Sequence, residues 1–249
     1  MPHAICTLAS IPLRKQPDLL SEMTSQLLFG DHYEILDAQS GFQLIRLAHD
    51  GYEGWITARQ GEPIDPEFFQ QLSDQPAPLL IDLVAPARFG DRSLHLVRGS
   101  HLPAEINGKA VTCEGQQINV RENAFTPALL ERFASEYLHA PYHWGGRSPF
   151  GIDCSGFTQI VFKLFDIPIP RDSQEQAKAG KPVSDLNDSR PGDLAFFFEN
   201  TSHVGLITST GILHASSAVR HDDLDEYGIR DRDTGTYTHQ LTSIRSLVS

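Results

Sequence analysis

One cysteine and two histidines carry the strongest chemical signal in this sequence. Cys154 lies in the run Asp153-Cys154-Ser155-Gly156-Phe157, which opens a segment with apolar residues at helical spacing. In the first turn of a helix, unpaired N–H groups and the positive end of the helix dipole stabilise a thiolate, so we expect a lowered pKa for Cys154. A thiolate nucleophile also requires a base and a group that orients the base. The spacing alone leaves a structural interpretation of Cys154 open, and we favour that interpretation for Cys6 and Cys113.

A predicted hairpin supplies the base and the orienting group. Residues 203–208 and 211–216 are predicted strands joined by a short loop. If the loop has an even number of residues, His203 pairs with position 214 or 216, and His203 and His214 share one face of the sheet, because side chains alternate along a strand. An odd loop or a bulge would break this parity. The opposite face then suits packing against helices, since it carries Val204, Leu206, Leu213 and Ala215.

The elements around these residues predict an α+β arrangement from residue 123 onward, with helices followed by an antiparallel meander. Thr126 is a predicted N-cap with Pro127 at the first helical position, and this helix is expected to end near residue 138, before Pro141. Ser173 and Gln176 form a predicted capping box for a short helix that runs to about residue 179. After a turn, strands are expected at 194–198, 203–208 and 211–216.

The first half of the chain is rich in short strand and turn patterns. Residues 33–36 and 42–47 are predicted strands separated by a turn at 37–41, and Asp50-Gly51 predicts a hairpin to a strand at 52–56. After a predicted linker at 61–66, a second set of strands is expected at 79–84, 94–97, 110–113 and 117–120. Two small β-barrels would account for this pattern, with a single irregular β-domain as the alternative.

Composition and charge argue against several classes of protein. The 249 residues include 20 Lys and Arg against 32 Asp and Glu, and the resulting net charge of −12 argues against nucleic-acid binding. The apolar runs are far shorter than the ~20 residues that a membrane span needs, and no secretory leader is legible. Three widely spaced cysteines do not suggest a disulfide framework. We therefore expect a cytoplasmic protein that binds neither membrane nor nucleic acid and uses no metal or other cofactor.

Four motifs, in order along the chain, carry a resemblance to a known family. They are Pro141-Tyr142-His143-Trp144-Gly145-Gly146-Arg147, Gly151-Ile152-Asp153-Cys154-Ser155-Gly156-Phe157, His203-Val204-Gly205 and Leu213-His214-Ala215-Ser216. Together they resemble the NlpC/P60 cysteine peptidases, papain-like enzymes that cut peptidoglycan stem peptides. The first half resembles the paired bacterial SH3-like domains found in one branch, the γ-D-glutamyl-L-diamino acid endopeptidases of murein recycling. The resemblance implies an α+β fold, with SH3-like β-barrels over 1–62 and 63–122 and a papain-like NlpC-type catalytic domain over 123–249.

The resemblance also implies a role for each matching residue. Cys154 would be the nucleophile, His203 the general base and His214 the residue that orients His203. Tyr142 corresponds to a tyrosine near the oxyanion hole, and Asp153 to a carboxylate that binds the free L-Ala amine of the substrate. Four further substrate contacts are expected, two from the catalytic domain and two from the SH3-like part: Ser155, Ser173, Glu22 and Tyr52.

Several of these residues also have a simpler structural interpretation. Asp153 could serve as the N-cap of the following helix, and Ser173 as the capping-box residue. Glu22 could be an ordinary solvated carboxylate, and Tyr52 a strand aromatic that packs on its own hairpin. The charged run at 220–226 is expected to be a solvated loop.

The implied function is hydrolysis of the γ-D-glutamyl-L-diamino acid bond in muropeptides with a free N-terminal L-Ala, as part of cell-wall recycling. Two alternatives belong to other classes. In a zinc hydrolase, Cys154, His203 and His214 would be metal ligands, although no fourth ligand at typical spacing is evident. In a non-catalytic cell-wall-binding protein, the SH3-like domains would act alone, and the joint presence of those three residues argues against this reading.

Overall fold

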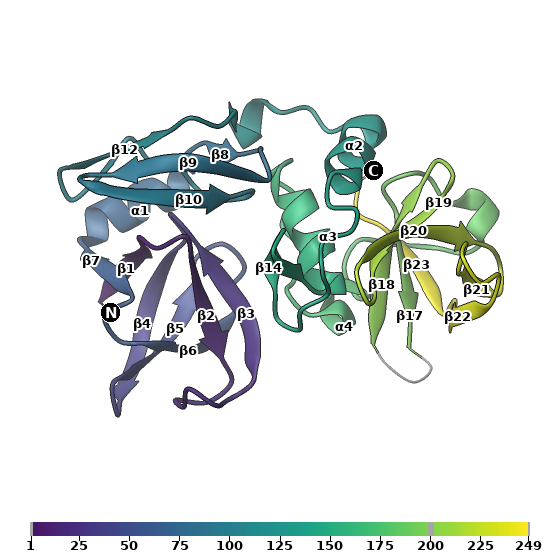
Figure 1. Ribbon diagram of the computed structural model, residues 1–249, viewed down its shortest axis with the longest axis horizontal. Helices are drawn as coiled ribbons and strands as arrows, with labels where there is room; N and C mark the ends of the chain where they lie inside the picture. The colour runs from purple at the N-terminus through teal and green to yellow at the C-terminus, as the bar shows by residue number, and fades with distance from the viewer. Residues whose placement is uncertain (1, 199–201, 249) are drawn as a thin grey trace. The chain divides into compact units, whose positions relative to one another are not determined.

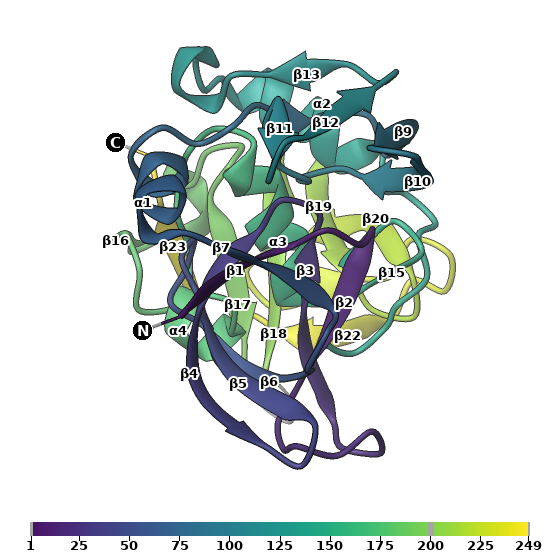
Figure 2. The same ribbon diagram turned by 90° about the vertical axis from the view of Figure 1, so that its left-hand side faces the viewer.

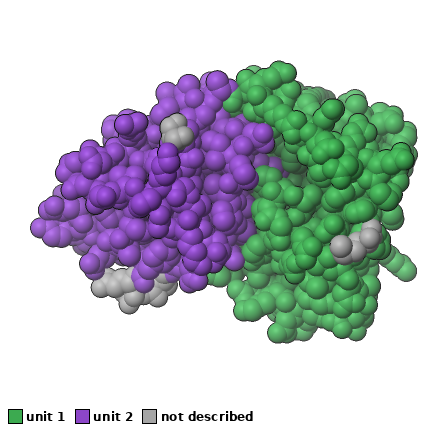
Figure 3. All heavy atoms as spheres, turned by 180° about the vertical axis from the view of Figure 1, so that it is seen from behind, with its two compact units in different colours: residues 1–123, 144–149 green, residues 124–143, 150–249 purple. Residues whose placement is uncertain are grey.

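The computed structural model describes residues 2–198 and 202–248, and the chain forms two compact units (Figure 3). Unit 1 comprises Met1–Asn123 and Trp144–Pro149, and unit 2 comprises Ala124–His143 and Phe150–Ser249. The short segment Trp144–Pro149 therefore belongs to unit 1, although the chain on both sides of it belongs to unit 2. Among the described helices, none is long and apolar enough to cross a membrane.

A seven-stranded antiparallel sheet forms the first part of unit 1, with the order β3-β2-β6-β5-β4-β1-β7 (Figures 1 and 2). Ile45 and Leu47 of β5 are buried in its apolar core, because alternate side chains of a strand share one face. The hairpin predicted at Asp50-Gly51 is confirmed by the β5–β6 ladder. The strands are β1 (His3–Cys6), β2 (Ser10–Arg14), β3 (Met23–Leu28), β4 (His32–Gln39), β5 (Phe42–Leu47), β6 (Glu53–Thr57) and β7 (Gly61–Ile64).

The predicted linker at 61–66 is wrong, because the segment forms a strand and the start of a helix. β7 pairs with β1 at the edge of the sheet, where Pro63 needs no N–H for a further strand. Oδ1 of Asp65 then accepts the N–H of Phe68 at 2.7 Å, which caps helix α1 (Pro66–Asp74). An Asp followed by a proline at the first helical position is a helix-start signal that the linker prediction passed over.

The predicted turn at 37–41 is shorter than expected. β4 continues through a bulge to Gln39, and only Ser40 and Gly41 separate it from β5. Both residues have positive φ, 51° and 82°, as a two-residue hairpin turn requires.

The rest of unit 1 consists of short strands with α1 and a 3-10 turn. One sheet has the order β10-β9-β12-β11, and β13 pairs with β8. Ile5 and Phe29 of the first part share an apolar core with Leu80 and Phe89, so the two parts of unit 1 pack on each other. The boundary predicted between 62 and 63 lies inside β7, and the division into two barrels stays a prediction. The elements are β8 (Leu79–Leu80), β9 (Val84–Phe89), β10 (Arg92–Val97), β11 (Glu105–Ile106), β12 (Lys109–Cys113), β13 (Gln117–Ile118), η1 (Val120–Glu122) and β14 (Arg147–Ser148).

Unit 2 combines helices with an eight-stranded antiparallel sheet, of order β16-β23-β17-β18-β19-β20-β21-β22 (Figure 1). Helix α2 begins as predicted, because Oγ1 of Thr126 accepts the N–H of Leu129 at 3.2 Å, although the helix ends at Ser135. Helix α3 is buried along its whole length and packs against β18 and β19. The elements are α2 (Pro127–Ser135), β15 (Gly151–Ile152), α3 (Cys154–Lys163), α4 (Ser173–Gln176), β16 (Lys181–Val183), η2 (Leu186–Asp188), β17 (Leu194–Phe197), β18 (His203–Thr208), β19 (Gly211–Ala215), β20 (Val219–Leu224), β21 (Gly228–Arg230), β22 (Tyr237–Gln240) and β23 (Ser243–Ser246).

Two local predictions in unit 2 are wrong. Ser173 is the first residue of α4 and not its N-cap, and no capping box forms, because the amide of Gln176 bonds to the carbonyls of Ser155 and Pro170. The run at 220–226 is not a solvated loop, because most of it lies in β20 beside β19. Alternation turns Asp222 inward, where buried polar partners satisfy its charge.

Candidate active site

Cys154 is the first residue of α3, and hydrogen bonds fix its position. Oδ1 of Asp153 accepts the N–H of Gly156 at 2.7 Å, which caps the start of the helix. Backbone N–H groups of Val204 and Ser155 form hydrogen bonds to the sulfur. Since Val204 follows His203 in β18, the thiol lies beside the first residues of that strand. Only 6% of Cys154 is exposed.

The thiol of Cys154 is protonated at neutral pH, so the expectation of a lowered pKa is wrong. Burial raises the pKa of Cys154 to about 12, and the neighbouring charge of Asp153 contributes to the increase. The hydrogen bond from Val204 and the charge of Arg171 lower this pKa, but by less. Loss of water around the sulfur outweighs the hydrogen bonds from Val204 and Ser155 and the charge of Arg171, and a base must therefore remove the proton before the sulfur can attack.

Tyr142 lies near the same helix start. Its N–H donates to the carbonyl of Ser217 at 3.1 Å, and it forms an isolated bridge with Ile152. Burial raises the pKa of Tyr142 to about 12, with further contributions from the negative charges that Cys154 and Asp153 can carry. The phenol is therefore neutral near the thiol and can donate a hydrogen bond.

Asp153 and Ser155 belong to a buried polar cluster. Arg171 donates from Nη2 to Oδ2 of Asp153 at 2.6 Å, from Nη1 to Oδ1 at 3.1 Å, and from Nη1 to Oγ of Ser155 at 2.8 Å. All three residues are buried. The capping interpretation of Asp153 is confirmed, and the substrate contacts of Asp153 and Ser155 stay predictions.

Ser173 lies beside the segment that leads into β18. Its hydroxyl forms a hydrogen bond with the hydroxyl of Ser202, the residue before His203. Gln176 ties α4 to α3, because it accepts the hydroxyl of Thr158 at 2.8 Å. The structure therefore brings Ser173 toward the strand of His203, and its contact with substrate stays a prediction.

His203 and His214 meet on one face of the sheet, as the parity argument predicted. Gly205 lies opposite His214 and Thr208 opposite Gly211, so the loop between β18 and β19 has two residues. Nε2 of His203 lies 2.9 Å from Nδ1 of His214. Nε2 of His214 lies 2.9 Å from Oδ2 of Asp222. All three side chains are buried, and together they form a hydrogen-bonded chain that we call the His203 relay.

The imidazole of His203 is held neutral. Burial lowers the pKa of His203 well below its ordinary value, and the positive charges that His214 and His239 can carry lower it further. His239 stacks on His203, with ring centroids 4.3 Å apart and an angle of 24° between the planes. A neutral ring can accept a proton, so His203 has the protonation state that a general base needs.

Asp222 is held as a carboxylate at the other end of the His203 relay. Arg220 donates from Nε to Oδ2 at 2.8 Å and from Nη2 to Oδ1 at 3.0 Å, and the N–H of Arg232 reaches Oδ1 at 3.0 Å. Burial alone would raise the pKa of Asp222. The hydrogen bonds from His214, Arg220 and Arg232 outweigh burial and hold that pKa well below its usual range.

His214 is not positioned as a metal ligand. Both ring nitrogens of His214 are hydrogen-bonded, to His203 and to Asp222, so neither directs a lone pair at a metal. Within residues 2–198 and 202–248, no group of three or more His, Cys, Asp or Glu side chains could hold a metal ion. The geometry therefore gives the zinc-hydrolase alternative no support.

Glu22 and Tyr52 lie in unit 1 and have partners there. Oε2 of Glu22 pairs with Lys15 at 3.1 Å and Oε1 accepts the indole N–H of Trp144 at 2.8 Å, and these hydrogen bonds lower the pKa of Glu22. Tyr52 lies just before β6 and not in a strand, and it packs against the apolar core of the first sheet. The contacts of Glu22 and Tyr52 with substrate stay predictions.

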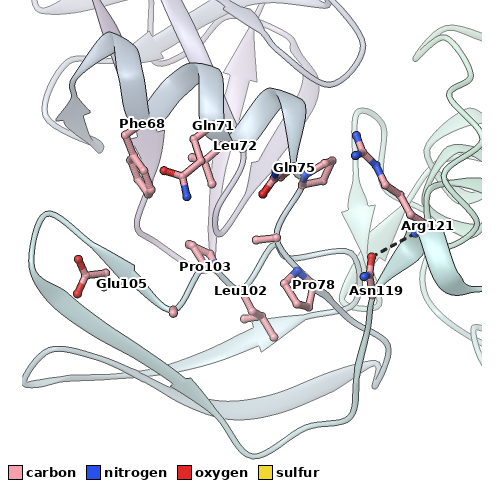
Figure 4. Close-up of a pocket in the computed structure, with 13 residues that line it drawn as sticks. Phe68, Gln71, Leu72, Gln75, Pro78, Leu102, Pro103, Glu105, Asn119 and Arg121 are labelled. Atoms are coloured by element: carbon pink, nitrogen blue, oxygen red, sulfur yellow. Dashed lines mark hydrogen bonds between the residues drawn. The ribbon is translucent and has the colours of Figure 1, made fainter.

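Unit 1 also holds a pocket of about 540 Å³ (Figure 4). Gln71 of α1 and Gln75, the residue that follows this helix, line one side of it, and Leu102 lies across from them. Its titratable lining residues are Glu105 and Arg121, and no cysteine, serine or histidine lines it. This pocket therefore offers none of the usual nucleophiles or bases of a cysteine peptidase.

Comparison with known proteins assigns this arrangement to a family. The NlpC/P60 family model matches residues 139–239, and a model of the bacterial dipeptidyl-peptidase Sh3 domain matches residues 13–60. A gamma-D-glutamyl-L-lysine dipeptidyl-peptidase of Bacillus subtilis (strain 168) is 34% identical over 218 residues, which cover 77% of this chain and 71% of that protein. This chain belongs to the NlpC/P60 family. A protein of the same name from Bacillus cereus (strain ATCC 10987 / NRS 248) is 28% identical over 80% of this chain and 69% of its own length.

A solved structure supports the fold of this NlpC/P60 protein. The crystal structure of an NlpC/P60 family protein from Bacillus cereus ATCC 10987 covers 99% of this chain and 100% of its own, with a TM-score of 0.83 and 21% identity. The predicted α+β fold, with an SH3-like N-terminal part before an NlpC/P60 domain, is confirmed. The protein is a cysteine peptidase of this family, so the alternative of a non-catalytic wall-binding protein is set aside.

The sequence did not indicate Arg171, Asp222 or His239 as site residues, although each of them contacts a predicted one. Strand alternation could have indicated Asp222. Arg220 lies opposite His214 in the ladder, and residues 220 and 222 share one face of their strand, which is the face of His214. Arg171 and His239 come from segments distant in sequence, and no spacing pattern connects either of them to Cys154 or His203.

Proposed function

We propose that this NlpC/P60 peptidase hydrolyses the γ-D-glutamyl-L-diamino acid bond of peptidoglycan-derived peptides that carry a free N-terminal L-Ala. The observation that carries the proposal is the similarity to the gamma-D-glutamyl-L-lysine dipeptidyl-peptidase of Bacillus subtilis, which extends over 77% of this chain and 71% of that relative. Short peptides released from the cell wall are the substrates that such a bond specificity implies, and we assign the enzyme to cell-wall recycling.

In the proposed mechanism, Cys154 is the nucleophile and His203 the base. His203 takes the thiol proton as the sulfur attacks the γ-carbonyl carbon of D-glutamate. His203 then returns that proton to the α-amine of the diamino acid as the C–N bond breaks, which leaves a thioester on Cys154. Water, activated by His203, hydrolyses the thioester and frees the thiol. The neutral ring of His203 and the burial of Cys154 beside Val204 support this assignment.

His214 and Tyr142 have supporting roles in this proposal. His214 holds the ring of His203 through the 2.9 Å contact between Nε2 and Nδ1. The N–H of Cys154, at the positive end of α3, is the proposed oxyanion donor, because unpaired N–H groups at a helix start stabilise negative charge. The neutral phenol of Tyr142 near Cys154 supports a second donor there.

Recognition of the free amine is the finer part of the proposal. We assign it to acidic and hydroxyl side chains, which attract an ammonium group. In unit 2 these are Asp153, Ser155 and Ser173, and the family resemblance implies Glu22 and Tyr52 of unit 1 as well. Asp153 already pairs with Arg171 through both oxygens, so its attraction for a second cation is reduced. Glu22, which is partly exposed, has more freedom to exchange its surface partner Lys15 for an ammonium group.

Mass spectrometry of a defined peptide tests the reaction. We expect L-Ala-γ-D-Glu-L-Lys to yield L-Ala-γ-D-Glu and L-Lys, and the diaminopimelate analogue tests the choice of diamino acid. Cys154→Ala should reduce the rate by about a thousandfold or more, because the nucleophile is lost. Cys113→Ala is the matched control, and its rate should equal that of the wild type. Cleavage at another bond, or a Cys154→Ala rate within tenfold of wild type, contradicts the proposal.

The amine requirement is tested by acetylating the L-Ala nitrogen. We expect the acetylated peptide to lose most of the activity, because the ammonium charge is gone. Glu22→Gln and Tyr52→Phe should raise KM for the free peptide while leaving the slow rate on the acetylated peptide unchanged. Glu53→Gln, which removes a surface partner of Arg46 in the same unit, is the control. Equal rates on both peptides would instead indicate an endopeptidase without amine recognition.

We also propose that the enzyme acts in the cytoplasm. All three cysteines of the chain are free thiols, which suits a reducing compartment. Fractionation of the source cells with an antibody to this protein tests the location, and recovery in the exported fraction would contradict it.

A further inference from the structure

We propose that Asp222 is a positioning residue that sets the tautomer of His203 through His214. This inference rests on the proposed role of His203 as the base. Its starting point is geometric: hydrogen bonds connect a carboxylate and two imidazoles in one order inside unit 2, and the helix start that carries Cys154 lies beside the strand of His203. The ionised carboxylate is the only one of these three groups that can accept a hydrogen bond but not donate one. It therefore fixes which ring nitrogen donates in each hydrogen bond between them.

The first link is the contact between Asp222 and His214. Oδ2 of Asp222 lies 2.9 Å from Nε2 of His214. An ionised carboxylate only accepts hydrogen bonds, so Nε2 of His214 must carry a hydrogen. In a neutral imidazole the other nitrogen is then an acceptor, and Nδ1 of His214 has a lone pair.

The second link is the hydrogen bond between His214 and His203, which determines the tautomer of His203. Nδ1 of His214 lies 2.9 Å from Nε2 of His203, and two lone pairs cannot form a hydrogen bond with each other. Nε2 of His203 must therefore carry the hydrogen, which leaves the lone pair on Nδ1. In the proposed mechanism, Nδ1 of His203 is therefore the nitrogen that takes the proton from Cys154. Without Asp222, the reverse tautomers of both rings would make an equally good bond and place a hydrogen on Nδ1 of His203.

The surroundings of Asp222 keep it an acceptor through the working pH range. Arg220 donates to both of its oxygens, and the N–H of Arg232 adds a third donor. Asp231 and Asp233 both pair with Arg220 from the outer side and balance its charge. On the inner side the titratable groups are the rings of His214, His203 and His239. The carboxylate therefore stabilises a positive charge on the rings without taking up the proton itself.

The tautomer can be measured on the unmodified protein by ¹⁵N NMR of the histidine rings at pH 7.5. Protonated and unprotonated ring nitrogens resonate in separate ranges, and each ring is assigned from His203→Gln and His214→Gln spectra. We expect hydrogens on Nε2 of both His203 and His214. A hydrogen on Nδ1 of His203 or of His214 would overturn the proposal, and this measurement requires no activity.

Asp222→Asn provides the second test, because an amide keeps the shape but has both a donor and an acceptor. We expect a mixture of His203 tautomers and a fall in kcat of about a hundredfold with KM within twofold. An Asp-to-Asn change that acts directly on a catalytic histidine costs about 10⁴-fold, and Asp222 acts one ring further away. Asp223→Asn is the matched control, since Asp223 is an exposed neighbour in the same strand.

The outcomes separate this inference from the proposed function. If the wild type cleaves the peptide and Asp222→Asn keeps both its kcat and the single tautomer, the inference is wrong and the proposed function stands. If the wild type does not cleave the peptide, the proposed function fails, while the NMR spectra still decide the tautomer. If circular dichroism shows that Asp222→Asn does not fold, the NMR spectra of the wild type alone decide whether His203 has the expected tautomer.

Discussion

Alkylation of Cys154 by iodoacetamide should be slow at neutral pH and should accelerate steadily as the pH rises. Burial raises the pKa of this thiol from 9.0 to about 12. At pH 7 the thiolate fraction is then about a thousandfold lower than for an ordinary cysteine. Because a thiolate of higher pKa is a stronger nucleophile, roughly 15- to 30-fold of this loss is recovered. We therefore expect alkylation to be about 50-fold slower than for an ordinary cysteine, before any effect of access.

The assay is quantitative peptide mass spectrometry after timed exposure to iodoacetamide between pH 5 and pH 10. Cys113 is partly exposed and serves as the reference thiol within the same molecule. The burial of Cys154 slows its alkylation at every pH. The slope of the alkylation rate against pH is therefore more informative than the absolute rate. With a thiol pKa of about 12, the rate should rise about tenfold for each pH unit over the whole range.

A plateau in that profile would refute the reasoning. If Cys154 and His203 formed a thiolate–imidazolium pair at rest, the rate constant would be high at pH 6 and change little up to pH 8. Such a result would mean that the helix N-terminus and the neighbouring imidazole outweigh the loss of water around the sulfur. His203→Gln gives a further check, because removal of the base should leave the slope of a protonated thiol unchanged.

Three further predictions concern pH and stability. The free energy of unfolding should fall below pH 6.5 by up to about 1.4 kcal/mol per pH unit from His203, because the unfolded ring takes up a proton that the buried neutral ring does not; urea titrations with no dependence on pH would contradict this. His239→Phe keeps a ring stacked on His203 but removes a group that can take up a positive charge at low pH, so the pKa of His203 should rise and the acidic limb of kcat/KM should move to higher pH; a shift to lower pH would contradict it. Thr126→Ala should cost about 1 kcal/mol in urea unfolding, since the N–H of Leu129 loses its capping oxygen, and Thr126→Ser should restore most of that loss; an unchanged midpoint for Thr126→Ala would count against this role.

Local patterns predicted the parts of the fold that depend on neighbours in sequence. The hairpin at Asp50-Gly51 and the helix that begins after Thr126 formed because their turn and cap residues act within a few positions. The strand at Gly61–Ile64 was missed because its glycine and proline disfavour strands, and its stability comes from β1, more than fifty residues earlier in the chain. Long-range pairing of this kind leaves no local signal.

The same distinction between local and long-range effects applies to the candidate site. Alternation along β18 and β19 was sufficient to place His203 beside His214, because a two-residue loop preserves parity. The pKa of Cys154 could not be predicted, since it depends on how much water reaches the sulfur, and that is a property of the packed unit. The prediction of a solvated loop at 220–226 fails because a run of charges usually indicates exposure, whereas Arg220 and His214 allow Asp222 to be buried.

The charges of the site are consistent with a protein that keeps its resting state neutral and prepares for the charge of the reaction. A buried thiolate–imidazolium pair would require two ions to lose their water, whereas a thiol and an imidazole lose little. When His203 takes the proton from Cys154, a positive charge develops on the ring, and the carboxylate of Asp222 is one imidazole away through two hydrogen bonds of 2.9 Å. Because Arg220 holds Asp222 ionised, that carboxylate is already charged before the reaction begins and needs no rearrangement to stabilise the proton on His203. The burial that makes Cys154 a poor nucleophile at rest thus also increases the strength of the interactions that form once its proton has moved.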